Sequence, residues 1–109
     1  MIAFKTHNDE HIETNMSSLS GHCSATRETL VKCFGEPLQG SGDGKVTTSW
    51  ELKVTTPEGT GVITIYDWKE YDNSADSANF DRWHVGGYSS DDSKILNKLI
   101  SQQTKLLVN

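Results

Sequence analysis

Aromatic residues form the most distinctive chemical feature of the sequence, in two segments of the second half of the chain. Tyr66 and Trp68 lie in the first segment, and Trp83 and Tyr88 begin and end the second. Exposed rings of this kind stack on bases or hold the side chains of a partner. The same rings can instead complete a second small core or an oligomer interface. The sequence therefore predicts either a binding platform or a buried or self-associating surface.

Three further residues beside the rings have side chains that can contact a ligand. Lys69 and Arg82 supply cations that pair with anionic groups such as phosphate. His84 lies between two apolar residues of a predicted strand, where a hydrogen-bonded structural histidine is the default interpretation. The predicted binding residues are Tyr66, Trp68, Lys69, Arg82, Trp83, His84 and Tyr88.

Catalytic and metal chemistry find little support in the sequence. His22 precedes Cys23, but neighbouring residues of a strand face opposite sides and cannot form a nucleophile and base pair. Cys33 lies late in a predicted helix, where the helix dipole disfavours a thiolate. His7 and His11 have the spacing of a helical metal site, but nothing favours a helix there. We expect no enzyme activity, no catalytic residue, no metal site and no cofactor.

Two polar stretches only superficially resemble ligand-binding motifs. QGSGDGK at residues 39–45 lacks the spacing of a phosphate-binding loop and leads into a strand, so it is interpreted as a connector. The acidic residues between Asp67 and Asp92 match no calcium loop or carboxylate pair. We interpret these acidic residues as solubilising.

Hydrophobic periodicity identifies the elements that must position these residues. Alternating apolar residues predict strands, apolar residues at helical spacing predict helices, and an aperiodic acidic stretch predicts a long mobile loop. The predicted strands are residues 16–23, 46–54, 61–69 and 83–88, the helices are residues 26–34 and 91–107, and the loop is residues 70–82.

The faces of two predicted strands follow from their alternation. In residues 61–69, Ile63 and Ile65 point to one side and are assigned to the core, whereas Val62, Tyr66 and Trp68 point to the other. The preceding turn, with Pro at its second position and Gly at its fourth, predicts a hairpin. In residues 16–23, the alternation places a leucine, a glycine and a cysteine on one face.

The predicted fold is α+β, with an antiparallel sheet of about four strands in the order β-α-β-β-β-α. Two helices are expected to pack on one face, which leaves the other face partly open. Residues 1–15 are polar and aperiodic, so they predict an arm that orders only against a partner. Residues 16–109 then make a single α+β domain.

Composition narrows the classes of partner. A net charge of -5 disfavours nucleic acid, because binding to phosphates is driven by positive charge. Two cysteines without a ligand pattern fit a reduced cytoplasmic setting. No apolar run approaches the length of a membrane span, so membrane insertion is not expected.

Four sequence blocks resemble small bacteriophage-encoded proteins without an assigned activity. They are LVKCFGEP at residues 30–37, GDGKVTTSWEL at 42–52, TIYDWKEY at 64–71 and WHVGG at 83–87. The resemblance implies a viral accessory protein that acts by binding in the cytoplasm of an infected bacterium, as an inhibitor of a host defence or regulatory protein. It implies no catalytic or ligand residues. The alternative function is an oligomeric sponge that sequesters a small nucleotide signal.

Overall fold

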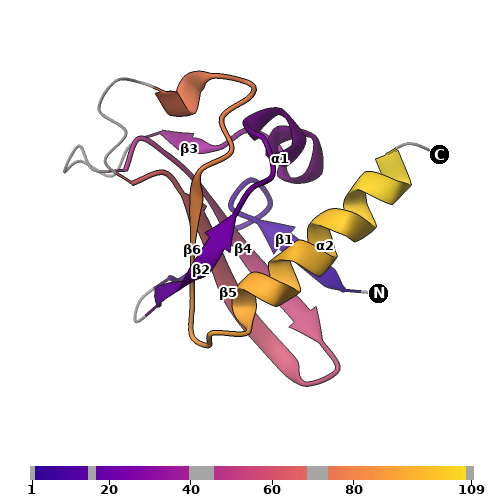
Figure 1. The fold of residues 1–109 in the computed structure, drawn as a ribbon. Coiled ribbons are helices and arrows are strands. Elements are labelled where there is room, and N and C mark those ends of the chain that lie inside the picture. Colours follow the sequence, from indigo (N-terminus) through magenta and orange to yellow (C-terminus); the bar gives the residue numbers. More distant parts are fainter. Residues whose placement is uncertain (1, 15–16, 40–45, 69–73, 108–109) are drawn as a thin grey trace.

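The computed structural model describes residues 2–14, 17–39, 46–68 and 74–107. Six strands, two α-helices and one 3-10 helix follow one another along these residues, and Figure 1 labels the strands and the α-helices. None of the helices within these ranges is long and apolar enough to cross a membrane. The elements are β1 (Ala3–Thr6), β2 (Ser18–Cys23), α1 (Arg27–Phe34), β3 (Leu38–Gln39), β4 (Thr48–Thr56), β5 (Gly59–Tyr66), the 3-10 helix η1 (Ser74–Asp76), β6 (Trp83–Gly87) and α2 (Asp92–Leu107).

The described strands form one six-stranded antiparallel sheet, so the predicted α+β class is confirmed. The strand order is β1-β4-β5-β6-β2, and β3 pairs with β4 outside this path. The predicted count of about four strands is too low. One missed strand, β1, lies in the segment predicted to be an arm, and the other, β3, has only two residues.

The hairpin predicted from the turn residues joins β4 and β5. Its pairing runs from Ser49 opposite Tyr66 to Thr56 opposite Gly59, so Pro57 and Glu58 form the turn. Gly59 has a φ of 136°, a conformation that glycine adopts without the steric penalty of a side chain.

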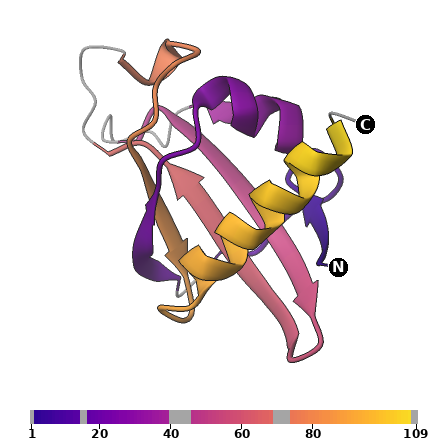
Figure 2. The ribbon, with the colours of Figure 1, turned by 45° about the vertical axis from the view of Figure 1, so that its right-hand side comes forward.

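Both α-helices cover the same face of the sheet, with the core between the layers (Figure 2). Ile63 and Ile65 are fully buried there, as their alternation predicts. Each large apolar side chain buried in this way contributes about 1.5–3 kcal/mol. The fully buried residues that face each other across these layers are Leu30 of α1, Leu96 and Leu99 of α2, and Trp50, Leu52, Ile63, Ile65, Trp83 and Val85 of the sheet.

The N-terminal segment is part of the sheet. β1 and β2 lie at opposite edges, so the chain between them must cross one face. The helices occupy the other face, and the one crossed by the chain is called the open face from here on. Ile12, in this connection, is 3% exposed and lines a hollow with Val62 and Tyr88. The expectation of an arm that orders only against a partner is wrong, because strand pairing and the burial of Ile12 hold this segment on the sheet.

The segment that ends at β6 is anchored to the start of α1. Ala75 and Phe80 are buried, and the Phe80 carbonyl accepts a hydrogen bond from the Arg27 N–H over 2.8 Å. The Ala78 carbonyl accepts one from the Glu28 N–H over 3.0 Å. These carbonyls satisfy two of the N–H groups that a helix leaves unpaired at its start. Residues 74–82 of the predicted mobile loop are therefore anchored by these contacts and form a cap over the start of α1. The rest of that loop lies outside the described residues.

A bulge in β2 changes the face of one side chain. The pairing of β2 with β6 shifts between Leu19 and Gly21, which leaves Ser20 as the extra residue. Leu19 consequently points to the open face and is 56% exposed, instead of sharing a face with Gly21 and Cys23 as strict alternation predicts. The Ser20 hydroxyl accepts a hydrogen bond from the Ser93 N–H over 3.2 Å, which ties the bulge to the first turn of α2.

Candidate binding site

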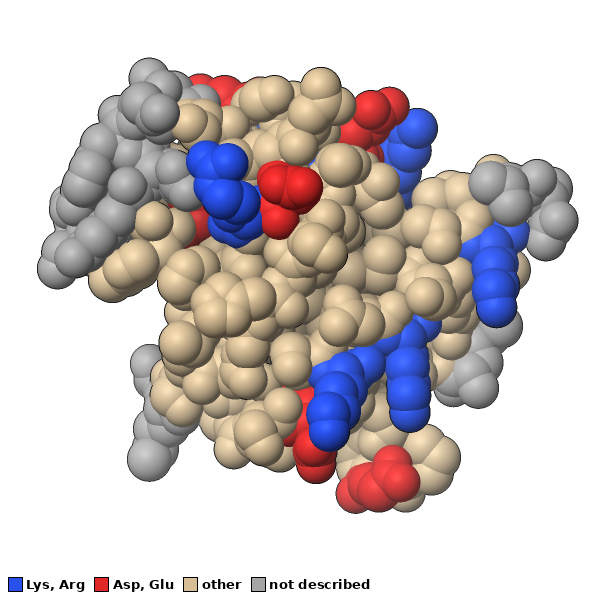
Figure 3. Space-filling view, viewed as in Figure 1, with Lys and Arg blue, Asp and Glu red and all other residues tan. Residues whose placement is uncertain are grey.

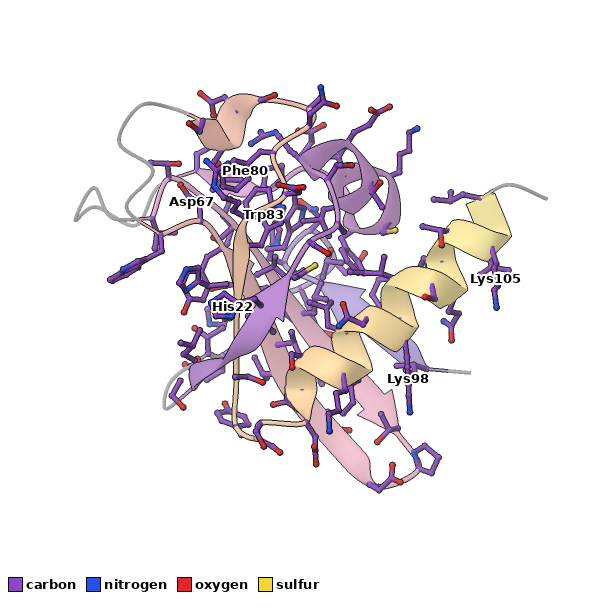
Figure 4. The ribbon with its side chains drawn as sticks, in the orientation of Figure 1. His22, Asp67, Phe80, Trp83, Lys98 and Lys105 are labelled. Atoms are coloured by element: carbon purple, nitrogen blue, oxygen red, sulfur yellow. The ribbon has the colours of Figure 1, made fainter. Side chains whose placement is uncertain are left out.

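A row of rings crosses the open face over three neighbouring strands. Tyr66 of β5 lies opposite His84 of β6, and His84 lies opposite His22 of β2. Successive strand residues alternate between faces, so these rings point away from the buried Cys23 and Trp83. Figure 4 marks His22 on β2, at the edge of the sheet.

The rings contact one another in a continuous cluster. The ring centroids of His22 and His84 are 4.8 Å apart, and those of Tyr66 and His84 are 5.6 Å apart. The ring of Trp68 lies 6.5 Å from both Tyr66 and His84. Such contacts contribute about 0.5–1.5 kcal/mol each beyond the area they bury. His22, Tyr66, Trp68 and His84 are called the aromatic patch from here on.

A buried carboxylate fixes the position of Trp68. Asp67 is fully buried, and its carboxylate accepts hydrogen bonds from the N–H groups of Thr47 and Thr48 over 2.8 and 2.9 Å. It also accepts one from the Thr47 hydroxyl over 2.6 Å. The interpretation of Asp67 as solubilising is therefore wrong. Because Asp67 points inward, Tyr66 and Trp68 project together to the opposite side.

A hollow of about 490 Å³ borders the patch at the β2 edge. Arg82 on its rim also lies over the ring of Phe80, with its guanidinium carbon 4.8 Å from the ring centroid. The hollow has a volume typical of small-molecule sites and offers imidazole, hydroxyl, carboxylate and guanidinium groups. Its lining residues are His22, Cys23, Ser24, Asp81, Arg82, Trp83 and His84.

Trp83 does not belong to the open face, which corrects its place among the predicted binding residues. Its side chain is fully buried, and its Nε1–H donates to the Ala25 carbonyl over 2.9 Å. Its ring packs edge-on against Trp50 and Phe80, with centroids 5.1 and 4.7 Å away. In Figure 4, Trp83 and Phe80 lie together below η1. Trp83 is therefore a core residue.

Only some of the other predicted binding residues lie in or beside the aromatic patch. Tyr88 is 54% exposed but lines the hollow near Ile12 and Val62, away from the patch. Arg82 is exposed beside the patch, as described above. Lys69 lies outside the described residues. The structure therefore brings together Tyr66, Trp68 and His84, with Arg82 next to them.

His22 is the member of the patch that the sequence does not predict. Its neighbour in the sequence is Cys23, whereas the residue opposite it in the sheet is His84. Each imidazole is adjacent in sequence to a buried residue, Cys23 or Trp83, so both rings must face outward. A histidine next to a buried strand residue is thus the signal in the sequence for an outward-facing imidazole. It identifies a pair of histidines only when the register between the two strands is known.

The electrostatic environment differs between the two faces. Lysine side chains gather along α2 on the helix-covered face (Figure 3), where Lys94, Lys98 and Lys105 are exposed. Figure 4 shows Lys98 and Lys105 projecting from this helix. On the open face, burial raises the pKa of the Tyr66 phenol. The patch is thus aromatic and weakly charged. Among the described residues that line its hollow, Arg82 is the only lysine or arginine.

Comparisons of the sequence with family models, with curated proteins and with solved structures give no match. The chemistry of the patch must therefore be argued from its own geometry.

Proposed function

We propose that the chain is a non-enzymatic binding protein and that the aromatic patch is its contact surface. The observation that carries this proposal is the exposure of Trp68, which is 41% exposed on the face without helices. Tryptophan and tyrosine are enriched among the residues that dominate the energy of protein interfaces. The rings of Tyr66 and His84 pack beside Trp68, so little conformational freedom remains to be lost on binding.

A bacterial host protein is the partner class that the resemblance to bacteriophage proteins implies. The proposed effect is inhibition of a defence or regulatory protein in the cytoplasm of the infected cell. The weak charge of the patch suits a partner surface with an apolar centre, because charged residues are depleted at the centre of protein interfaces.

The hollow beside the patch supports a second candidate, the nucleotide sponge. In that function, the exposed ring of Trp68 stacks on a base and Arg82 contacts a phosphate. Lys45 and Lys69, which can serve as further phosphate contacts, lie outside the described residues. This candidate requires a ligand that reaches from the hollow to Trp68.

Affinity capture with matched variants tests the leading proposal. Wild type, Trp68→Ala and Leu107→Ala are immobilised and exposed to bacterial lysate, and the retained proteins are quantified by mass spectrometry. Leu107 is the control, because it is 54% exposed at the end of α2. We expect a protein retained by wild type and Leu107→Ala but lost with Trp68→Ala. With the purified partner, removal of a hot-spot tryptophan should weaken binding by about 2 kcal/mol or more.

Other outcomes assign the patch differently. Equal capture by wild type and Trp68→Ala, or no specific capture, contradicts the proposal. Quenching of tryptophan fluorescence by a cyclic nucleotide, lost in both Trp68→Ala and Arg82→Ala, supports the sponge instead. A dimer in sedimentation that dissociates in Trp68→Ala assigns the patch to a second copy of the chain.

A further inference from the structure

We infer that His22 and His84 form a binding site for a divalent transition-metal ion such as Zn²⁺, Ni²⁺ or Cu²⁺. The two residues lie directly opposite each other on neighbouring strands. Both point to the open face, and both line the same hollow. Imidazole is the side chain that this class of ion prefers. Metal binding at this site requires no protein partner and goes beyond the proposed function, and both histidines belong to the aromatic patch.

The separation of the rings matches the geometry of two imidazoles on one ion. A metal to nitrogen distance of about 2.1 Å places each ring centroid about 3.2 Å from the ion. Two ligands at the angles of octahedral or tetrahedral coordination then have centroids about 4.6–5.3 Å apart. The observed separation of 4.8 Å lies in this range. The separation of the two rings is therefore compatible with coordination of one ion by both imidazoles.

The surroundings leave room for other ligands on the ion. Within the described ranges, no group of three or more His, Cys, Asp or Glu residues is placed to hold a metal. Water or an external ligand must therefore complete the coordination, and the hollow beside His22 gives access to it. Asp81 on the lining supplies negative charge, Arg82 supplies positive charge, and the net charge of -5 on the chain favours a cation.

The shell around His84 restricts its position. Tyr66 packs 5.6 Å from the His84 ring and Trp68 packs 6.5 Å from it, measured between centroids. Neighbours that orient a ligating histidine increase the affinity for the metal. Trp68 also gives an optical signal close to the ion.

His7 and His11 have no histidine opposite them in the described strand pairing. His11 is exposed and lies apart from the patch, so its substitution is the matched control.

The test uses full-length protein without a histidine tag. Zn²⁺ is titrated into wild type, His22→Ala, His84→Ala and His11→Ala by calorimetry, and the imidazole ring signals are followed by NMR. Thermal melts are not suitable, because the buried thiols of Cys23 and Cys33 become metal ligands when the chain unfolds. Circular dichroism verifies that each variant is folded.

We expect one Zn²⁺ per wild-type chain, with shifts in the signals of His22 and His84. Loss of a group that merely orients a ligand costs about 10–100-fold in affinity, so loss of either ligand should cost at least about tenfold. His11→Ala should bind as wild type does. The inference is overturned if wild type shows no saturable binding, or if folded His22→Ala and His84→Ala bind Zn²⁺ with unchanged affinity.

Discussion

Asp67 and Thr48 exchange two hydrogen bonds, and both residues are fully buried. The Thr48 N–H donates to Asp67 Oδ1 over 2.9 Å, and the Asp67 N–H donates to the Thr48 carbonyl over 3.2 Å. The first residue of β4 is thus bound to the residue that follows β5. This pair closes the open end of the hairpin immediately beside Trp68.

Replacement of Asp67 should destabilise the fold and disturb the patch. Asp67→Ala leaves two N–H groups and a hydroxyl without their acceptor, at an expected cost of about 3–5 kcal/mol. Asp67→Asn keeps one carbonyl acceptor and should cost less. Urea unfolding gives both values, and the tryptophan emission of the folded variants reports the change in packing. A loss below about 0.5 kcal/mol in Asp67→Ala would contradict the structural role of this carboxylate.

Gly87 should not tolerate a side chain. A Cβ at this position would lie 2.8 Å from both Cβ and Cγ of Asp92, whose carboxylate accepts hydrogen bonds from the N–H groups of Tyr88 and Ser89. Gly87→Ala should therefore cost about 1–3 kcal/mol, measured by urea unfolding. Gly61→Ala is the control, because nothing lies within 4 Å of its added Cβ. Equal effects of the two substitutions would argue against close packing at Gly87.

Arg27 should hold the segment before β6 against α1. Its guanidinium donates to the Ala75 carbonyl over 2.8 Å and to the Thr48 hydroxyl over 3.3 Å. Arg27→Ala should cost about 1–3 kcal/mol and accelerate hydrogen exchange around Ala75. Lys32→Ala is the control, because its ion pair with Glu28 is exposed and should contribute less than about 0.5 kcal/mol. Unchanged exchange in Arg27→Ala would show that the cap does not depend on this side chain.

Alkaline pH should weaken the fold partly through Tyr66. Burial raises the pKa of its phenol above the ordinary value of 10.0, so the folded chain holds this proton more tightly than the unfolded chain. Its contribution to stability is fully present below that ordinary value and is lost as pH rises through the raised pKa. Burial of the thiols of Cys23 and Cys33 acts in the same direction, since it raises their pKa values.

Comparison with Tyr66→Phe isolates the contribution of Tyr66 to the loss of stability at alkaline pH. Urea midpoints measured between about pH 8 and pH 11 should fall less steeply in this variant than in wild type. Absorbance of the tyrosinate ion should show that the variant has lost a titration step above the ordinary range. Parallel stability curves for the two proteins would contradict the assignment to Tyr66.

Local patterns in the sequence predict much of the fold, because they record which side of an element is buried. Alternation alone assigns Ile63 and Ile65 to the core, and the helix predicted over residues 26–34 corresponds to α1 with Thr26 as its N-cap. Its side chain accepts the Thr29 N–H over 3.2 Å, as an N-cap should. Elements with a repeated apolar pattern were therefore predicted with nearly correct boundaries.

The missed features depend on contacts between distant segments. The pairing of His22 with His84 follows from strand register, and the burial of Asp67 follows from donors near the start of β4. Leu19 changes face because of a bulge, and the local sequence pattern does not predict that bulge. β1 is a four-residue edge strand, too short for its alternation to stand out. The candidate site was therefore only partly predictable, although three of its four rings were named.

The long distance along the chain between β2 and its partner β6 has a consequence for the order of folding. The β4–β5 hairpin closes over a two-residue turn, whereas β2 must find β6 across most of the chain. Contacts between distant residues form more slowly because a long loop must close first. We expect the hairpin to form early and the β2–β6 pair late. A chain stalled before that step would have a hairpin and nascent helices but no aromatic patch, so the site becomes available only when folding is complete.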